Sequence, residues 1–590
     1  MNKEDLLTYK RKLMSLSEEE IKLRNIYLRK LSLGEIHGPN CNYPSIDKTW
    51  LKYYKEYYIM SKLPNMTCYE FLKKCNEDNL DSIAIESYEG TYTYNELFEI
   101  IDKTAVSLYE MGIKKGHNVM MFFGASFYEP VLLYSIDAVG AALSEVPIQL
   151  TLSEIIEKIN NLDIDMFFVD GSLLNHEMEK EIYNKTKVKN IIYTGKYMNS
   201  TNVNTISWNC FLEKGKGKIL PKIEKNPNDL LFIASTGGST GKPKSVMLSD
   251  NCFNFAAHQY INSDLNYNKG DRWLRLWALF SASACISNNH LPLCAGMHNI
   301  IRSFPMNINE FDQMVQLEKP NHLVLIPQLM DVLDKSEILD KDLNYIKTIG
   351  CGGLAITNQF ENRIQEFLYK HNIKTYIGYG WGCTESFTIG SIRSNYDTSL
   401  IGGVGAPLVD TIVSTFDPDT LEEKEFGEEG ELCIKTPVTM LGYYKDKQNT
   451  SNVLKMHSDG SIWLHTGDLG VINEDGIVTV IGRMTRTIFV FPVAKLYPTE
   501  LENLISKIPG VLDVVVCEIP DLEHEGFSLP VCYVIPQEDQ DIHTLENDIR
   551  DVCNISLPEY ARPCKYIFVN EFPLTKVGKK DVKTLENKLR

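Results

Sequence analysis

The run Leu230-Leu-Phe-Ile-Ala-Ser-Thr-Gly-Gly-Ser-Thr-Gly-Lys-Pro-Lys244 joins an apolar segment to a loop of small and basic residues. Its apolar part, 230–234, predicts a buried β-strand because it is short, continuous and bounded by turn residues. Backbone amides of small residues, hydroxyl groups and lysines all bind phosphate oxygens. The stretch therefore predicts an α/β fold with a polyphosphate-binding loop at the end of a strand.

The loop does not fit the best-known phosphate-binding pattern. A Walker A loop requires Ser or Thr after its Gly-Lys pair, and here Pro243 follows Gly241 and Lys242. This excludes a P-loop NTPase. A flexible glycine-rich loop without a ligand is the alternative that the string alone leaves open.

From about residue 65 to residue 480, short apolar runs alternate with amphipathic helical segments, as at Val119–Phe123, Met166–Val169 and His322–Ile326. This alternation is typical of α/β layers. After about residue 482 the pattern becomes that of a small α+β unit, with a second helix expected over Ile542–Ser556. We therefore expect a large N-terminal multi-layer α/β domain, 61–485, and a small mobile α+β C-terminal domain, 486–590.

Residues 1–60 precede this pattern and are expected to form a helical N-terminal extension. Ser17 stands ahead of Glu18-Glu-Glu20, and a hydroxyl cap followed by acids favours a helix start. The aromatic residues that follow, Trp50, Tyr53, Tyr54, Tyr57 and Tyr58, are expected to pack on the main body. Docking of a partner by these aromatic residues is the alternative.

Composition limits the function classes. The 590 residues include 60 basic and 78 acidic side chains, a formal charge of -18. Without a basic run, this charge argues against binding to nucleic acid. The 14 cysteines show no C-x-x-C pair or Cys/His ligand spacing, so free thiols in a reducing cytoplasm are expected.

One stretch, Leu276–Ile301, contains no charged residue other than histidine and is long enough to span a bilayer. It also carries Asn288, Asn289 and His290, which are costly in lipid. We expect no membrane span and interpret the stretch as buried protein interior, forming a pocket wall.

The loop resembles the phosphate-binding signature of the adenylate-forming superfamily, which includes acyl-CoA synthetases, adenylation domains of peptide synthetases and luciferases. The family's other motifs follow in order, and the resemblance covers about residues 65–590. It implies that the loop binds the phosphates of ATP through Thr236, Gly237, Gly238, Ser239, Thr240, Gly241 and Lys244.

Gly380-Trp-Gly-Cys-Thr-Glu385 resembles the family's aromatic-Gly-x-Thr-Glu motif. By this match Gly380, Trp381 and Gly382 form the adenine site, with Trp381 stacked on the base. Thr384 bonds the phosphate, and Glu385 is the ligand of Mg²⁺. The resemblance also implies that Tyr379 and the turn Gly352-Gly353 line the acyl and adenine pockets.

Trp463-Leu-His-Thr-Gly-Asp468 resembles the Thr-Gly-Asp motif, whose Asp accepts hydrogen bonds from both ribose hydroxyls. Gly482-Arg483 resembles the Gly-Arg pair that places Arg483 near the ribose and phosphate. Pro573-Leu-Thr-Lys-Val-Gly-Lys-Lys-Asp581 resembles the C-terminal signature. Its lysine, Lys579, would bridge the attacking carboxylate and the α-phosphate, stabilising charge in the transition state.

The resemblance implies an acid-thiol ligase. A carboxylic acid attacks the α-phosphorus of Mg·ATP, pyrophosphate leaves, and the acyl group passes to coenzyme A or to the phosphopantetheine of an acyl carrier protein. The alternative is a degenerate, non-catalytic relative that binds nucleotide or a carrier protein.

The sequence departs from the family in two places. Arg486, Phe489 and Pro492 stand where the family usually has Asp, Lys and Gly around the interdomain hinge, which puts the thiol-transfer step in question. Phe280-Ser281 aligns with the Phe-Asp of amino-acid-activating domains. Since Ser281 cannot balance an ammonium group, we expect an apolar or aromatic acid without an α-amino group.

Overall fold

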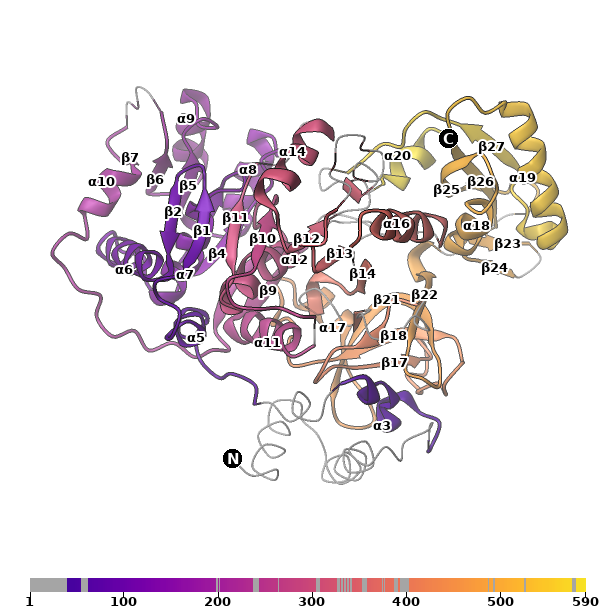
Figure 1. Cartoon of the computed structure of the whole chain (residues 1–590), viewed down its shortest axis with the longest axis horizontal. Helices are drawn as coiled ribbons and strands as arrows, with labels where there is room; N and C mark the ends of the chain where they lie inside the picture. Colours follow the sequence, from indigo (N-terminus) through magenta and orange to yellow (C-terminus); the bar gives the residue numbers. More distant parts are fainter. Residues whose placement is uncertain are drawn as a thin grey trace.

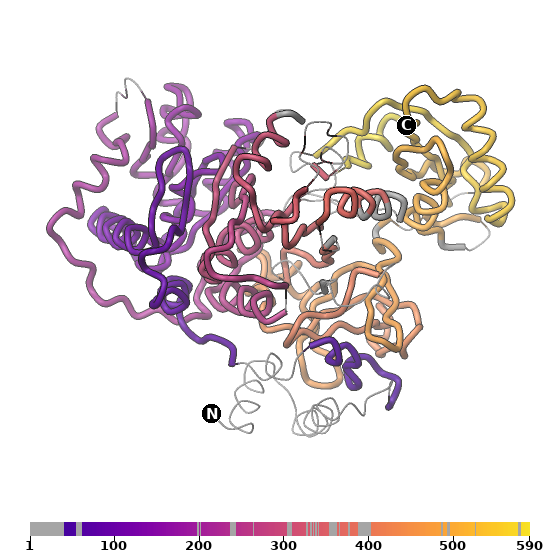
Figure 2. Tube along the Cα trace, in the orientation of Figure 1, coloured from indigo at the N-terminus to yellow at the C-terminus, as the bar shows by residue number. Residues whose placement is uncertain are grey.

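The computed structural model describes residues 40–54, 62–197, 200, 202–236, 244–263, 265–303, 308–325, 329–330, 333, 336, 339, 342–352, 358–373, 375, 377–386, 391–392, 403–486, 488–491, 494–524, 527–575 and 580–589. The helix expected to begin at Ser17 lies outside these ranges. Figure 1 shows the arrangement of the elements, and Figure 2 shows the course of the chain in the same orientation.

An eight-stranded sheet forms the first half of the large domain, with the strand order β19-β9-β8-β4-β3-β5-β6-β7. The strands are β19 (Gly442–Tyr443), β9 (Ser245–Ser249), β8 (Leu230–Ser235), β4 (Ala142–Glu145), β3 (Asn118–Phe122), β5 (Ile164–Asp170), β6 (Asn190–Thr194) and β7 (Thr205–Ser207). From β8 to β7 the strands are parallel. The connecting helices include α6 (Tyr94–Glu110), α7 (Tyr128–Ala138), α8 (Leu152–Asn161), α9 (His176–Lys185), α10 (Trp208–Glu213) and α11 (Asp250–Ile261).

A nine-stranded sheet lies beside it, with the order β16-β15-β14-β13-β12-β10-β11-β1-β2. Its strands are β16 (Ala406–Pro407), β15 (Ser391–Ile392), β14 (Ile377–Trp381), β13 (Thr348–Gly352), β12 (His322–Leu325), β10 (Arg272–Arg275), β11 (His298–Ile301), β1 (Ile83–Ser87) and β2 (Gly90–Thr93). A continuous apolar core joins the two sheets, since Val119 and Leu143 share it with Trp273 and Ile301.

The uncharged stretch 276–301 forms α12 (Ala282–Cys285), a π-helical turn (Ile286–His290), α13 (Leu291–Cys294) and β11. Most of its side chains are buried, including Asn289 and His290. None of the helices in the described part of the chain combines the length and apolar character needed to cross a bilayer. The interpretation of this stretch as protein interior is confirmed.

A third sheet, drawn in orange in Figure 1, has the order β17-β18-β21-β20 with β22 paired to β21. Its strands are β17 (Ile412–Phe416), β18 (Gly430–Lys435), β21 (Ile462–Ile472), β20 (Leu454–Met456) and β22 (Val478–Arg483). The N-terminal segment packs on it through α3 (Pro44–Asp47) and the 3₁₀ turn Thr49–Tyr53. Trp50 and Tyr54 are buried in one cluster with Phe416 and Trp463, which confirms that these two residues pack on the main body. Tyr57 and Tyr58 lie outside the described residues.

The C-terminal residues, drawn in yellow at the end of the chain in Figure 1, form a small α+β unit. It contains β23 (Ile488–Val490), β24 (Ala494–Leu496), α18 (Pro498–Ile505), β25 (Val511–Pro520), β26 (Ser528–Pro536), α19 (Ile542–Ser556), β27 (Lys565–Phe568) and α20 (Val582–Asn587). Strands β25, β26 and β27 make one sheet. The α/β class, with a large N-terminal and a small C-terminal domain, is confirmed.

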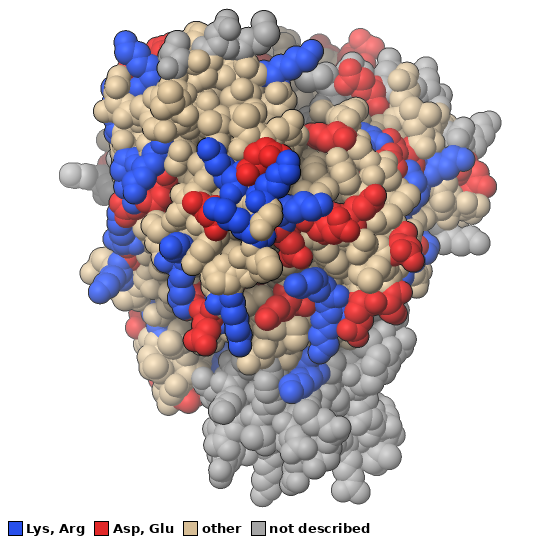
Figure 3. Space-filling view, turned by 90° about the vertical axis from the view of Figure 1, so that its left-hand side faces the viewer, with Lys and Arg blue, Asp and Glu red and all other residues tan. Residues whose placement is uncertain are grey.

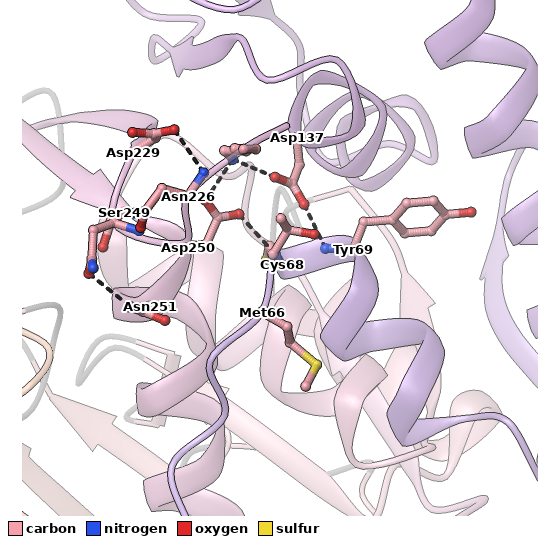
Figure 4. A network of polar contacts seen from close by, with 12 residues as sticks. Met66, Cys68, Tyr69, Asp137, Asn226, Asp229, Ser249, Asp250 and Asn251 are labelled. Atoms are coloured by element: carbon pink, nitrogen blue, oxygen red, sulfur yellow. Dashed lines mark hydrogen bonds and ion pairs between the residues drawn. The ribbon is translucent and has the colours of Figure 1, made fainter. Parts of the chain in front are cut away.

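A buried ionic network ties the loop before β8 to the helices beneath it (Figure 4). The ammonium group of Lys225 lies between the carboxylates of Asp137 and Asp250, all three side chains being almost fully buried. Asp137 also accepts a hydrogen bond from the backbone N–H of Tyr69 at 2.6 Å, and Asp250 accepts one from the N–H of Cys68 at 2.9 Å. Helix α5 (Cys68–Cys75) is thereby fixed at its first turn.

On the surface, charges of both signs are mixed. Figure 3 shows basic and acidic side chains side by side on one face of the molecule. Ion pairs between partly exposed side chains include Lys218 with Glu110 and Lys216 with Glu213.

Candidate active site

The predicted phosphate loop starts where β8 ends. The backbone N–H of Thr236 donates to the carbonyl of Lys244 at 2.9 Å, and the N–H of Lys244 donates to the Thr236 hydroxyl at 3.0 Å. These bonds close the base of the loop. Five predicted members, Gly237, Gly238, Ser239, Thr240 and Gly241, lie outside the described residues.

A lysine that the sequence did not single out lies beside this loop base. Lys158, on α8, donates to the hydroxyl of Ser235 at 2.7 Å. Burial lowers the pKa of Lys158. Within the amphipathic pattern of α8 nothing distinguishes this residue from a surface lysine, so only the fold reveals its position.

Strands β13 and β14 bring two predicted glycines together at their carboxyl ends. Gly352 pairs with Gly380 in the parallel register, and a Cβ atom on Gly352 would lie only 3.1 Å from the Gly380 carbonyl oxygen. A side chain at Gly352 would therefore push the strands apart. Tyr379 is partly buried against a cluster that includes Cys351; Gly353 lies outside the described residues.

Glu385, in the 3₁₀ turn Thr384–Ser386, faces a tyrosine that was not predicted. The Tyr443 hydroxyl donates to the Glu385 carboxylate at 2.7 Å, and the Lys244 ammonium group lies 4.7 Å from the centre of the Tyr443 ring. Burial, together with the neighbouring Glu385, raises the pKa of Tyr443. Tyr443 thus stays a proton donor and links the loop base to the Thr-Glu motif.

Three predicted residues meet at Asp468. The indole N–H of Trp381 donates to one carboxylate oxygen at 2.9 Å, and the guanidinium group of Arg483 lies 3.0 Å from the other. Asp468 on β21 is also the register partner of Arg483 on β22. The nine-stranded and five-stranded sheets are therefore joined by side chains from three separate motifs.

The predicted acyl-pocket residues Phe280 and Ser281 follow β10. Ser281 caps α12, its hydroxyl accepting the N–H of Ala284 at 3.2 Å. Ahead of them, the N–H of Leu279 donates to buried Glu129 at 2.7 Å, and Glu129 pairs with buried Arg275. This pair anchors the segment, and neither member was predicted.

The hinge region carries the departures noted in the sequence. Arg486 donates to the Glu502 carboxylate and to the Val516 carbonyl, both at 2.9 Å, so its side chain is held by the C-terminal unit. Phe489 is 52% exposed. Pro492 and Lys579 lie outside the described residues.

The donor set near the loop suits a magnesium nucleotide. Mg²⁺ in such sites is held by one or two carboxylates and the phosphates of the substrate, and Glu385 supplies a carboxylate held by the phenol that lies against Lys244. When bound, the metal would neutralise phosphate charge.

Comparison with known proteins agrees with this geometry. Residues 71–444 match the model of the AMP-binding enzyme family, and residues 500–579 match the model of the AMP-binding enzyme C-terminal domain. The chain belongs to the AMP-binding enzyme family. It is an adenylate-forming ligase, an enzyme that activates a carboxylic acid as acyl-AMP.

The similar AMP-binding enzymes include 4-coumarate–CoA ligase 1 of Petroselinum crispum, 23% identical over 565 residues, covering 92% of this chain and 96% of the relative. The 4-coumarate–CoA ligase of Vanilla planifolia is also 23% identical, over 88% of this chain and 93% of its own length.

The solved structures that share the fold include a CoA ligase and an amide bond synthetase. The anthranilate CoA ligase AuaEII, in complex with anthranoyl-AMP, has a TM-score of 0.77 at 19% identity, over 89% of this chain and 98% of that one. The amide bond synthetase McbA from Marinactinospora thermotolerans has a TM-score of 0.75 at 19% identity, over 89% of this chain and all of that one.

Proposed function

We propose that this AMP-binding enzyme activates an apolar or aromatic carboxylic acid without an α-amino group and then transfers the acyl group to a thiol. The observation that supports it most is that Trp381, at the end of β14, and Arg483, at the end of β22, both contact the carboxylate of Asp468. Ligands of α/β proteins bind outside the carboxyl ends of the strands. Residues of four sequence motifs border this region.

The proposed division of labour follows the motifs. The loop from Thr236 to Lys244 binds the phosphates that leave as pyrophosphate, and Thr384 contacts the α-phosphate. Glu385 holds Mg²⁺. The Asp468 carboxylate accepts hydrogen bonds from the ribose hydroxyls, and Arg483 lies beside it. The protein contributes positioning and countercharge, and the substrate carboxylate is itself the nucleophile.

Lys579 has the remaining role in the first half-reaction. Its ammonium group would contact both the attacking carboxylate and the α-phosphate oxygens, so that its charge is most effective as negative charge gathers in the transition state. Proposed domain limits of 61–485 and 486–590 place Lys579 on the small domain, which must therefore approach the large domain for adenylation.

The proposed acid class rests on the segment after β10. Ser281 supplies no charge to balance an α-ammonium group, and burying such a group unpaired is costly. The surrounding stretch 276–301 is mostly buried and lacks Asp, Glu, Lys and Arg. The names of the similar enzymes also refer to aromatic acids, 4-coumarate and anthranilate.

The proposed acceptor is coenzyme A or the phosphopantetheine of an acyl carrier protein, in the cytoplasm. The thioester forms when the thiolate attacks the acyl carbonyl and AMP leaves. The anchored Arg486 and exposed Phe489 occupy the hinge region. A non-catalytic relative that only binds nucleotide or a carrier protein is the competing function.

An acid panel tests this proposal. The enzyme, ATP and Mg²⁺ are incubated with apolar, aromatic, α-amino and dicarboxylic acids, and acyl-AMP is trapped with hydroxylamine. Product masses with coenzyme A and with a loaded carrier protein then identify the acceptor. Apolar or aromatic acids should give the hydroxamate and one of the two thioesters. Trapping only with α-amino acids would contradict the proposed acid class.

A further inference from the structure

A row of three buried ionisable side chains lies beside Thr466-Gly467-Asp468, an irregular turn of the backbone within β21 where its pairing with β18 shifts register. Glu431 on β18 contacts His465 on β21, with the Glu431 carboxylate 2.7 Å from Nδ1 of the imidazole. The Nε2 atoms of His465 and His457 lie 2.9 Å apart. His457 comes from the hairpin between β20 and β21, and all three side chains are buried. The row therefore runs from the hairpin to the centre of the sheet.

Hydrogen bonding gives the row a direction. Although burial acts to raise it, the pKa of Glu431 is lowered by its bond to His465, so the group is a carboxylate. A carboxylate only accepts, which makes Nδ1 of His465 the donor; in the neutral imidazole Nε2 of His465 is then an acceptor. His457 must then donate from Nε2. Burial first, and the neighbouring His465 second, lower the pKa of His457 to about 4, so a neutral donor suits this place.

Charged and aromatic side chains surround His457 in the described part of the chain. His465, Asp459, Lys455 and Glu431 are the charged or titratable neighbours. The Phe416 ring meets the His457 ring edge-on at 4.5 Å between centroids, and Trp463 packs at 5.7 Å. In the described part of the chain Nδ1 of His457 is buried without a hydrogen-bond partner. Aromatic packing could be supplied by phenylalanine at lower cost, so the histidine is explained by its bond to His465.

The far end of the row controls the backbone of the turn. The second oxygen of Glu431 accepts the N–H of Gly467 at 2.9 Å, and Gly467 has φ +72°. The Thr466 hydroxyl donates to the Leu432 carbonyl at 2.6 Å and accepts the N–H of Asp468 at 3.1 Å. The direction in which Asp468 leaves the turn is thus fixed by β18, and Glu431 is the charged group that fixes it.

A metal centre is the other chemistry this cluster could support. Glu431, Cys433 and His465 place potential ligand atoms within 4.8 Å of one another. Tetrahedral zinc with bonds of about 2.0 Å keeps its ligand atoms roughly 3.3 Å apart. The 2.7 Å contact between Glu431 and His465 is closer than that, and a hydrogen bond satisfies both groups. The geometry favours a hydrogen-bonded support over a metal site.

We propose that His457 is a positioning residue for the nucleotide: through His465 and Glu431 it holds the turn so that the Asp468 carboxylate meets the ribose hydroxyls of ATP. The inference rests on the proposed function, in which Asp468 binds the ribose. It adds a residue outside the adenylate-forming motifs and a route by which that residue acts. Neutral His457 orients His465, His465 orients Glu431, and Glu431 holds Gly467.

The test compares ATP with 2′-deoxy-ATP in the acid-dependent exchange of pyrophosphate into ATP. His457→Phe keeps the ring and removes the donor, whereas His457→Gln keeps an N–H group that can reach His465. A charge-assisted hydrogen bond to the ribose should make wild-type kcat/KM about tenfold higher for ATP than for 2′-deoxy-ATP. In His457→Phe this ratio should fall to about two, with a higher KM for ATP and an unchanged KM for the acid. His457→Gln should restore it.

His322→Phe is the matched control. His322 is also a buried histidine with two hydrogen-bonding neighbours, Thr348 at 2.8 Å and Asp271 at 3.0 Å, but it lies at the opposite end of its strand from the site. The control should lose thermal stability and keep the tenfold ratio. If His457→Phe fails to fold, Glu431→Gln interrupts the row at its other end and should lower the same ratio.

The outcomes separate the inference from the function on which it rests. A wild-type preference for ATP that survives unchanged in folded His457→Phe and Glu431→Gln would overturn the positioning role and leave the proposed function standing. A wild-type enzyme that exchanges pyrophosphate but treats both nucleotides alike would overturn the ribose role of Asp468, and this inference with it. Stoichiometric zinc in the purified protein would overturn the hydrogen-bonded support.

Discussion

The indole N–H of Trp381 donates a 2.9 Å hydrogen bond to the carboxylate of Asp468. Both side chains are buried, and they belong to different sheets, β14 and β21. The other Asp468 oxygen faces Arg483 at 3.0 Å. The carboxylate proposed to bind the ribose is therefore oriented before any nucleotide arrives, and preorganised polar groups bind with less reorganisation.

Replacing Trp381 with Phe should weaken ATP binding. The ring is retained, but Asp468 loses a charge-assisted hydrogen bond of about 1.5–3 kcal/mol. We expect KM for ATP to rise about tenfold, with little change in KM for the acid, in pyrophosphate-exchange assays. Trp208→Phe, a buried indole in the apolar core of the first sheet, is the control. Equal effects of the two substitutions on KM for ATP would refute the specific role of Trp381.

Tyr443→Phe should impair adenylation through the magnesium requirement. The substitution removes the O–H donor that holds Glu385 at 2.7 Å but keeps the ring beneath Lys244. We expect kcat to fall about tenfold. We also expect the Mg²⁺ concentration for half-maximal activity to rise, which a titration with Mg²⁺ at fixed ATP measures. Tyr444→Phe is the neighbouring control, since its hydroxyl faces Asn118 and Asp163. An unchanged Mg²⁺ titration curve in Tyr443→Phe would count against the account.

Local sequence patterns predicted the positions of several strands and of one helix. The strands expected at 119–123, 166–169, 230–234 and 322–326 correspond to β3, β5, β8 and β12, and the helix expected at Ile542–Ser556 is α19. Short apolar runs between turn residues have few other solutions in an α/β chain. The family resemblance, carried by motifs in order, supplied the function.

Contacts between residues that are far apart in the chain could not be predicted from the sequence. Tyr443 meets Glu385 across 58 positions, and Arg275 meets Glu129 across 146. No local periodicity encodes such pairs; they arise only when β19 joins the edge of its sheet and β10 ends beside α7. Lys158 was missed for the same reason. The roles of all the predicted site residues remain predictions, and Gly237–Gly241, Gly353 and Lys579 also lie outside the described residues.

Lys225→Met should destabilise the protein strongly. Without the ammonium group, Asp137 and Asp250 are left as two buried acids without a countercharge (Figure 4). Burial, and then the neighbouring Asp137, already raise the pKa of Asp250. Breaking a buried ion pair costs about 3–5 kcal/mol. Thermal unfolding should show a large drop in Tm, and exposed Lys222→Met should show none; equal Tm values would contradict the network's role.

His290 should make stability depend on pH. Its Nδ1 lies 3.0 Å from the Tyr134 hydroxyl and its Nε2 lies 3.0 Å from the Asn254 side-chain oxygen, so the neutral ring is fully bonded. Burial lowers the pKa of His290 from about 6.5 to about 3. Between these values the unfolded chain binds a proton that the folded protein does not. The stability contributed by neutral His290 is complete above pH 6.5 and is lost as the pH falls.

The size of this effect can be measured by comparison. From pH 7 to pH 4 the loss is about 3 kcal/mol. In His290→Gln the decline of Tm over this range should be shallower than in wild type, whereas exposed His543→Gln should follow wild type. A His290→Gln slope as steep as that of wild type would show that this ring does not carry the pH dependence.

The most direct test of the central claim is exchange of labelled pyrophosphate into ATP, with and without the preferred acid from the panel. Exchange should require the acid. It should fall at least about a hundredfold in Lys579→Ala, because this variant loses charge stabilisation in the transition state. It should persist in Lys580→Ala, because the Lys580 ammonium group is paired with Asp513 at 2.6 Å. ATP binding without acid-dependent exchange for any acid tested would contradict acyl-adenylate formation and favour the non-catalytic alternative.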